Sequence, residues 1–189
     1  KAADEIIEEE GLEAFTLRSC ARRAGVSHSA PAHHFKDRAG LLSAYAASIF
    51  RDLTTFVEDH VQQAGTDNYA QLQAVGLAYI RFALQRPSAF SLIFRCESLD
   101  KNVLELKEAS DACFQVLIDI VQSLMPEASK ETILLRSMLA WSTVHGFATL
   151  WLEGNFAKVY AHKDVEPMCY ADTLAQQILQ SIKPAFVQP

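Results

Sequence analysis

The stretch FTLRSCARRAGVSHSAPAHHFKDRAGLL, residues 15–42, decides the fold because it predicts two short helices separated by a tight turn. Thr16 is a typical N-cap for a first helix over Leu17–Ala24, and Gly25 supplies the left-handed residue that ends it. Ser27 is then the expected N-cap of a second short helix. Two short helices set at an angle by such a turn are typical of a helix-turn-helix.

The side chains of these two helices favour contact with DNA. Apolar residues of the first helix recur at helical spacing and predict a buried stripe. Three arginines fall outside this stripe and are left for solvent or phosphate: Arg18, Arg22 and Arg23. The second helix is expected to run to about Phe35, with Val26 and Phe35 closing a small core. Its exposed part carries small and hydrogen-bonding side chains that suit base edges in a major groove, namely His28, Ser29, Ala30, Ala32 and His33. Ser27 is counted with them among the expected DNA-binding residues.

The run T-L-R-x-x-A-x-x-A-G-V-S, followed by H-F-x-D-R-x-x-L-L, resembles the DNA-binding domain of the TetR family of transcriptional regulators. The matching positions are Thr16, Gly25, Val26, Ser27, His34, Phe35 and Leu41. The aromatic residue common two positions before the histidine is Ala32 here, which removes one expected backbone contact. The resemblance implies a dimer that binds a palindromic DNA operator, acts as a repressor and is released by a small effector. The expected phosphate contacts are Thr16, Arg18, Lys36 and Arg38.

Charge is distributed unevenly along the chain. The net charge is −6, which taken alone argues against nucleic acid. From Leu17 to Arg51, however, six basic residues stand against one Asp, giving +5. Most acids lie elsewhere, and those of the first helix are Asp4, Glu5, Glu8, Glu9, Glu10 and Glu13. One face can therefore attract DNA while the acidic remainder limits non-specific binding.

The rest of the chain predicts an all-α fold of about nine helices. After the helix-turn-helix, helices are expected over 38–63, 68–85, 88–95, 104–124, 129–152 and 168–182. Their ends carry capping residues, glycines or prolines such as Asp37, Pro87 and Ser129. We expect a three-helix DNA-binding domain over residues 1–45 and a larger helical domain for effector binding and dimerisation over 46–189.

The larger domain also resembles the C-terminal domain subtype named WHG for its Trp, His and Gly residues, here Trp141, His145 and Gly146. Aromatic residues on several helices could line an effector pocket, namely Phe82, Phe90, Phe94, Phe114, Trp141 and His145. The alternative is that the rings fill a solid core, with Trp141 and His145 as a hydrogen-bonded part of it. No second buried charge is evident, so the expected effector is mainly apolar or aromatic.

Two helices carry apolar stripes that predict a four-helix interface between two copies of the chain. The stripe of the 129–152 helix consists of Leu139, Thr143, Phe147 and Leu150, and that of the last helix of Leu174, Ile178 and Ile182. Dimerisation suits a helix-turn-helix, because two joined reading heads bind two half-sites.

Other classes of function find little support in the sequence. The four cysteines are far apart, which favours reduced thiols, and His33 and His34 are adjacent rather than one turn apart, so no metal site or cofactor is expected. No apolar stretch reaches membrane-spanning length, which indicates a cytoplasmic protein. A helical enzyme using His145 is an alternative without a recognisable catalytic set, so we expect no enzyme. A regulator controlled by a partner protein remains open.

Overall fold

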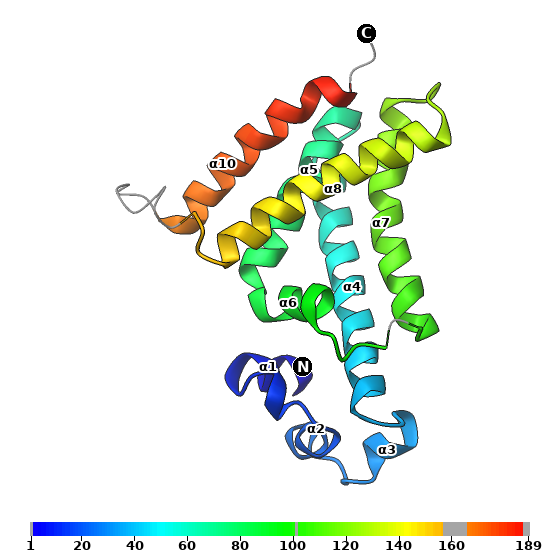
Figure 1. The fold of residues 1–189 in the computed structure, drawn as a ribbon, viewed down its shortest axis with the longest axis vertical. Helices are drawn as coiled ribbons and strands as arrows, with labels where there is room; N and C mark the ends of the chain where they lie inside the picture. Colours follow the sequence, from blue (N-terminus) through cyan, green and yellow to red (C-terminus); the bar gives the residue numbers. More distant parts are fainter. Residues whose placement is uncertain (1, 101, 157–165, 187–189) are drawn as a thin grey trace. The chain divides into compact units, whose positions relative to one another are not determined.

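The computed structural model describes residues 2–100, 102–156 and 166–186, and these residues form helices without any strand (Figure 1). The chain divides into two compact units. The first unit contains Lys1–Asp52 and Ser88–Asp111, and the second contains Leu53–Pro87 and Ala112–Pro189. None of the helices described is both long and apolar enough to cross a membrane. The all-α prediction is confirmed, and the predicted domain bounds of 1–45 and 46–189 stay a prediction.

The N-terminal region consists of α1 (Ala2–Glu9), the 3-10 turn η1 (Leu12–Ala14), α2 (Leu17–Ala24) and α3 (Ala30–His34). Helix α2 has the bounds that its capping residues predict. Thr16 is its N-cap, and Gly25, at φ 70°, occupies the left-handed position where a side chain would be strained. Helices α1 and α3 both pack against α2. The region therefore forms a compact helix-turn-helix.

The second helix of this motif is shorter than the sequence predicts. Helix α3 begins at Ala30 rather than just after Ser27. Ser27 instead belongs to a turn, in which the Ala30 N–H donates to the Ser27 carbonyl at 3.0 Å. Pro31 explains the difference. If Ser27 were the N-cap, Pro31 would stand where an N–H must bond to the Ser27 carbonyl, and proline has none. In the observed helix Pro31 occupies the first turn, where no N–H is needed.

The core of the first unit forms where α1 and the η1–α2 connection meet α4 (Arg38–Gln63). Its fully buried side chains include Ile6, Phe15, Leu42 and Ile49. The Phe15 ring stacks on Tyr45 with ring centres 5.6 Å apart, and the Tyr45 hydroxyl donates to the Asp4 carboxylate at 2.6 Å. Asp37 caps α4 by accepting from the Gly40 N–H, as predicted. The same unit contains most of α6 (Pro87–Arg95) and the first part of α7 (Leu104–Leu124).

The second unit is built around α5 (Asn68–Gln85), which packs against both α8 (Lys130–Leu152) and α10 (Pro167–Ile182) (Figure 1). Gly76 of α5 permits this close approach. A Cβ at Gly76 would lie 2.6 Å from a Leu179 methyl of α10 and 3.3 Å from a Val144 methyl of α8. The guanidinium of Arg81 on α5 also forms an ion pair with Asp172 on α10 at 2.6 Å. Helix α10 is therefore fixed to α5 by packing and by charge.

Candidate functional site

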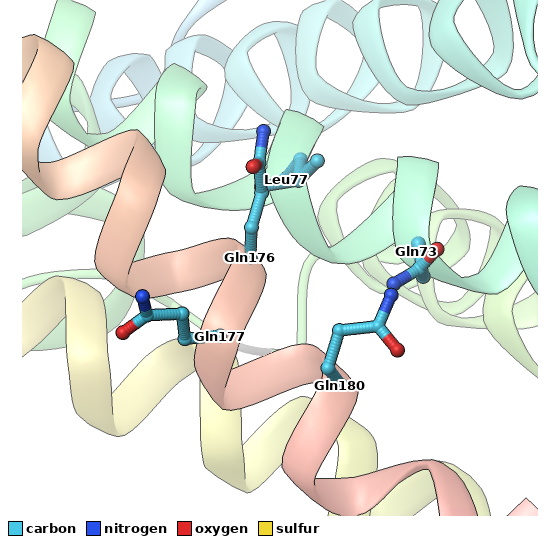
Figure 2. Close-up of a pocket in the computed structure, with 5 residues that line it drawn as sticks. All are labelled: Gln73, Leu77, Gln176, Gln177 and Gln180. Atoms are coloured by element: carbon cyan, nitrogen blue, oxygen red, sulfur yellow. The ribbon is translucent and has the colours of Figure 1, made fainter.

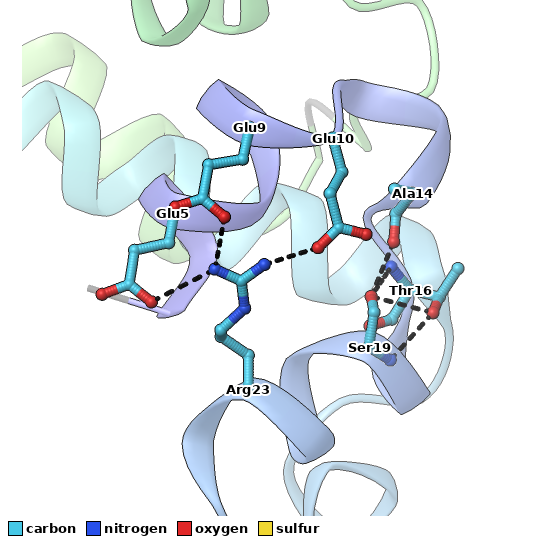
Figure 3. A network of polar contacts seen from close by, with 7 residues as sticks. All are labelled: Glu5, Glu9, Glu10, Ala14, Thr16, Ser19 and Arg23. Atoms are coloured by element: carbon cyan, nitrogen blue, oxygen red, sulfur yellow. Dashed lines mark hydrogen bonds and ion pairs between the residues drawn. The ribbon is translucent and has the colours of Figure 1, made fainter.

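The N-terminus of α2 is held by a reciprocal capping box (Figure 3). The Thr16 hydroxyl accepts from the Ser19 N–H at 3.0 Å, and the Ser19 hydroxyl accepts from the Thr16 N–H at 2.9 Å. Ser19 also donates to the Ala14 carbonyl at 2.6 Å. These bonds satisfy the N–H groups of Thr16 and Ser19 and fix the direction of α2. A phosphate contact from Thr16 stays a prediction.

Arg23 of α2 pairs with acidic side chains of α1 and of the residue directly after it, contrary to the expectation that Arg23 is left for solvent or phosphate. Its guanidinium lies 2.8 Å from the Glu9 carboxylate, 2.5 Å from Glu10 and 3.6 Å from Glu5 (Figure 3). The hydrogen bonds to Glu9 and Glu10 raise the pKa of Arg23 above its ordinary value. The local charge of α2 is thus partly neutralised, and Arg23 links α1 to α2.

Arg38, expected at phosphate, bonds to the protein backbone instead. Its Nε donates to the Phe15 carbonyl at 2.8 Å, and its Nη2 donates to the Leu12 carbonyl at 2.7 Å. The side chain is half-buried, at the first position of α4. Arg38 therefore holds the connection between η1 and α2 against the start of α4. Arg51, another cation of the predicted basic segment, pairs with Glu105.

Three cations remain exposed on the helix-turn-helix: Arg18, Arg22 and Lys36. Arg18 and Arg22 are four residues apart on α2 and so lie on one side of it. The predicted DNA-binding residues Ser27, His28, Ser29 and His33 are exposed as well, and Ala30 is half-buried, whereas the side chain of Ala32 lies outside the described part of the chain. The structure thus offers a surface of cations and hydrogen-bonding groups, with a smaller positive charge than the sequence alone suggests.

In the second unit, Tyr79 of α5 joins two of the predicted effector-site residues on α8. The Trp141 indole N–H donates to the Tyr79 hydroxyl at 3.3 Å, and this hydroxyl lies 2.8 Å from His145 Nδ1. Burial raises the pKa of the Tyr79 phenol above its ordinary value, so the phenol stays protonated. The Phe114 ring lies 5.5 Å from the Trp141 ring, measured between centres. The sequence gives no signal for Tyr79, because its partners follow 62 and 66 residues later.

The other predicted effector residues make separate contacts. Phe82 packs against Phe56 within the second unit, and Phe90 packs against Phe94 within the first. An open groove of about 540 Å³ lies elsewhere in the second unit, between α5 and α10. Figure 2 shows its lining residues, Gln73, Leu77, Gln176, Gln177 and Gln180. None of the six predicted effector residues lines this groove, and an effector pocket made by them stays a prediction.

Helix α8 exposes large apolar side chains along its outer side. They are Leu134, Leu135, Met138, Leu139, Trp141 and Leu150. Leu139 and Leu150 belong to the predicted interface and are exposed. Phe147, also predicted there, is only 5% exposed and packs against Trp151 and Phe156 of its own chain. Thr143 of α8 and the predicted α10 residues Leu174, Ile178 and Ile182 are half-buried. Outside the helix backbone, no described atom lies within 4 Å of a Cβ built on Gly146, which leaves open space there.

Two of the four cysteines have thiols that burial makes less reactive. Burial raises the pKa of the Cys20 and Cys113 thiols, which disfavours the reactive thiolate. All four cysteines are free, and Cys169 is exposed. Within the described part of the chain, His, Cys, Asp and Glu side chains do not gather in a group of three that suits a metal ion.

Comparison with known proteins places this geometry in a family. A family model described as bacterial regulatory proteins, tetR family, matches residues 1–45. A second, described as tetracyclin repressor-like, C-terminal domain, matches residues 72–170, and it does not confirm the WHG subtype. The HTH-type transcriptional regulator BetI of Stenotrophomonas maltophilia is 36% identical over 75 residues, which are 40% of this chain and 38% of that protein. The match thus spans well under half of the curated relative.

Solved structures resemble the chain over nearly its whole length. A protein of unknown function from a Rhodococcus species is 27% identical, with a TM-score of 0.73 over 95% of this chain and 90% of that one. A TetR variant from Acinetobacter baumannii in complex with minocycline is 14% identical, with a TM-score of 0.61 over 99% of this chain and 95% of that one. At this identity the likeness shows only that the two chains share a fold. With family models matching both its helix-turn-helix and more than half of its length, the chain belongs to the TetR family of bacterial regulatory proteins.

Proposed function

We propose that the protein is a cytoplasmic transcriptional repressor that binds an inverted-repeat DNA operator as a homodimer and is released by a small apolar or aromatic effector. The observation that carries this proposal is the surface of α2, α3 and their turn. Exposed Arg18 and Arg22 supply phosphate contacts, and exposed His28, Ser29 and His33 supply base contacts. A regulatory rather than catalytic role follows from this surface and from the family.

The salt dependence of binding tests the assignment of the cations. Replacing Arg18 and Arg22 together by Ala should lower the slope of log affinity against log salt by about two per half-site, because each arginine releases about one counterion. Arg23→Ala is the matched control on the same helix. Its pairing with Glu9 and Glu10 predicts an unchanged slope. Equal slopes for the double variant and the wild type would remove Arg18 and Arg22 from the DNA contacts.

The outer side of α8 supports the homodimer. Exposed leucines that recur at helical spacing, such as Leu135 and Leu139, form an apolar stripe that a second copy would bury. The open space at Gly146 would allow the partner helix to approach closely. We propose that α8 and α10 of two chains form a four-helix interface, with Leu139, Leu150 and the half-buried Leu174 and Ile178 contributing.

We place the effector near the cluster of Tyr79, Phe114, Trp141 and His145. Its side chains are all aromatic, which suits an apolar or aromatic ligand. The Trp141–His145–Gly146 pattern supports the WHG subtype. Helix α4 starts in the first unit and ends in the second. An effector that binds best to dimers with a different tilt of α4 would lower the fraction of dimers whose two helix-turn-helix motifs have the spacing that DNA requires.

Tyr79→Phe tests the effector assignment. Removing the hydroxyl should lower the free energy of unfolding by about 1–2 kcal/mol, because a buried hydroxyl with two contacts is lost. Uncharged aromatic compounds that raise the melting temperature of the wild type should bind the variant about tenfold more weakly, as measured by thermal shift titration. Compounds with undiminished affinity for a destabilised variant would show that Tyr79 is a core residue and that the effector binds elsewhere.

A further inference from the structure

Val26, in the turn between α2 and α3, is 49% exposed, although the sequence predicts that it closes a small core. Apart from Val26, the large apolar side chains exposed in the described residues lie on α7 and α8. A single exposed apolar residue is common on protein surfaces. What distinguishes Val26 is the rigidity of its backbone and its position within the helix-turn-helix.

The backbone of Val26 is fixed by the end of α2. Its N–H donates to the Ala21 carbonyl at 3.0 Å, and the Gly25 N–H donates to the Arg22 carbonyl at 3.2 Å. With Gly25 left-handed, this is a Schellman motif. In such a motif an apolar residue at the position of Val26 usually packs against the residue at the position of Ala21. Alanine is too short to cover a valine, so the isopropyl group is held in place and left in solvent.

Exposed polar residues lie on both sides of Val26 along the chain. Arg22 precedes it by one helical turn, and Ser27 and His28 follow it directly. Together these residues offer a charge for phosphate and hydrogen-bonding groups for bases. An apolar group among them matches the one apolar feature of the major groove, the C5-methyl group of thymine.

We propose that Val26 is a specificity-determining residue that contacts a thymine methyl group in each half-site of the operator. The inference rests on the proposed DNA-binding function. Because the Schellman motif fixes the backbone before DNA arrives, little conformational entropy opposes the contact. The buried methyl surface then favours thymine at one position over cytosine or uracil, which lack the methyl group.

Uracil substitution tests the contact one methyl group at a time. The probes are versions of the inverted repeat that the wild-type protein selects from random duplexes, with each thymine in turn replaced by deoxyuridine in both half-sites. At one position the wild type should lose about fourfold in affinity per half-site, the value for about one buried methyl group. Val26→Ala should bind the thymine duplex as weakly as the wild type binds that uracil duplex, and should respond little to the substitution.

Leu104→Ala provides the control, because Leu104 is exposed and lies outside the helix-turn-helix. It should behave as the wild type on every duplex. The proposal would be overturned if every uracil substitution changed the affinity of the wild type and of Val26→Ala by the same factor. It would also be overturned if Val26→Ala were less stable but still bound the thymine duplex more tightly than the uracil duplex. Failure of the wild type to bind any duplex would instead refute the proposed function itself.

Discussion

Replacing Leu135 and Leu139 together by Glu should give a folded monomer whose operator affinity is about 100- to 10,000-fold lower than that of the wild type. The two side chains are 62% and 39% exposed, so the substitutions leave the core of the chain intact. In a dimer, by contrast, the carboxylates would be buried without partners. The loss of affinity follows because a monomer binds each half-site independently.

Sedimentation velocity measures whether the double variant is a monomer, and thermal melting measures whether it is folded. Leu104→Glu is the matched control, since Leu104 is 67% exposed on α7 and has no place in the proposed interface. It should remain a dimer with full operator affinity. A double variant of α8 that sediments as a dimer and binds the operator normally would move the interface to another face of the molecule.

Arg38→Ala should weaken DNA binding at every sequence and lower the free energy of unfolding of the protein by about 2–3 kcal/mol. The reason is structural, because two charge-assisted hydrogen bonds, to the Phe15 and Leu12 carbonyls, are lost. Arg38→Lys should be nearly as damaging. A lysine carries the charge but cannot bridge two carbonyl oxygens as a planar guanidinium does.

Lys36→Ala separates the structural role of Arg38 from a phosphate contact. Lys36 is exposed, so its removal should lower the salt slope of DNA binding by about one per half-site and leave the stability unchanged. Denaturant unfolding and salt-titrated binding give both quantities for each variant. If Arg38→Ala instead kept its stability and lost about one unit of slope, Arg38 would be a phosphate contact after all.

Helix ends could be predicted from local chemistry. Thr16, Gly25 and Asp37 each satisfy or terminate the backbone next to them, so their effect is readable from a few residues. Helices α4 and α5 have the bounds that the sequence predicts. Helix α3 does not, because the requirement of Pro31 for a first-turn position outweighs the preference of Ser27 for an N-cap.

The roles of charged and aromatic side chains were harder to predict because their partners are distant in sequence. Arg23 pairs with carboxylates 13 and 14 residues earlier, and Arg38 reaches a carbonyl 26 residues earlier. Helical spacing alone shows neither partner. Helix α8 is apolar around much of its circumference, so periodicity could not assign Phe147 to the core and Leu135 to the exposed side. Such assignments require the packing of α5 against α8.

Selection from a random library of DNA duplexes, followed by mass measurement of the purified complex, tests most directly whether the helix-turn-helix reads DNA as a twofold dimer. The predicted result is enrichment of an inverted repeat whose half-sites lie about one helical turn, or a multiple of it, apart, with two chains on each duplex. Recovery of no common sequence, or of an asymmetric site occupied by a single chain, would contradict it.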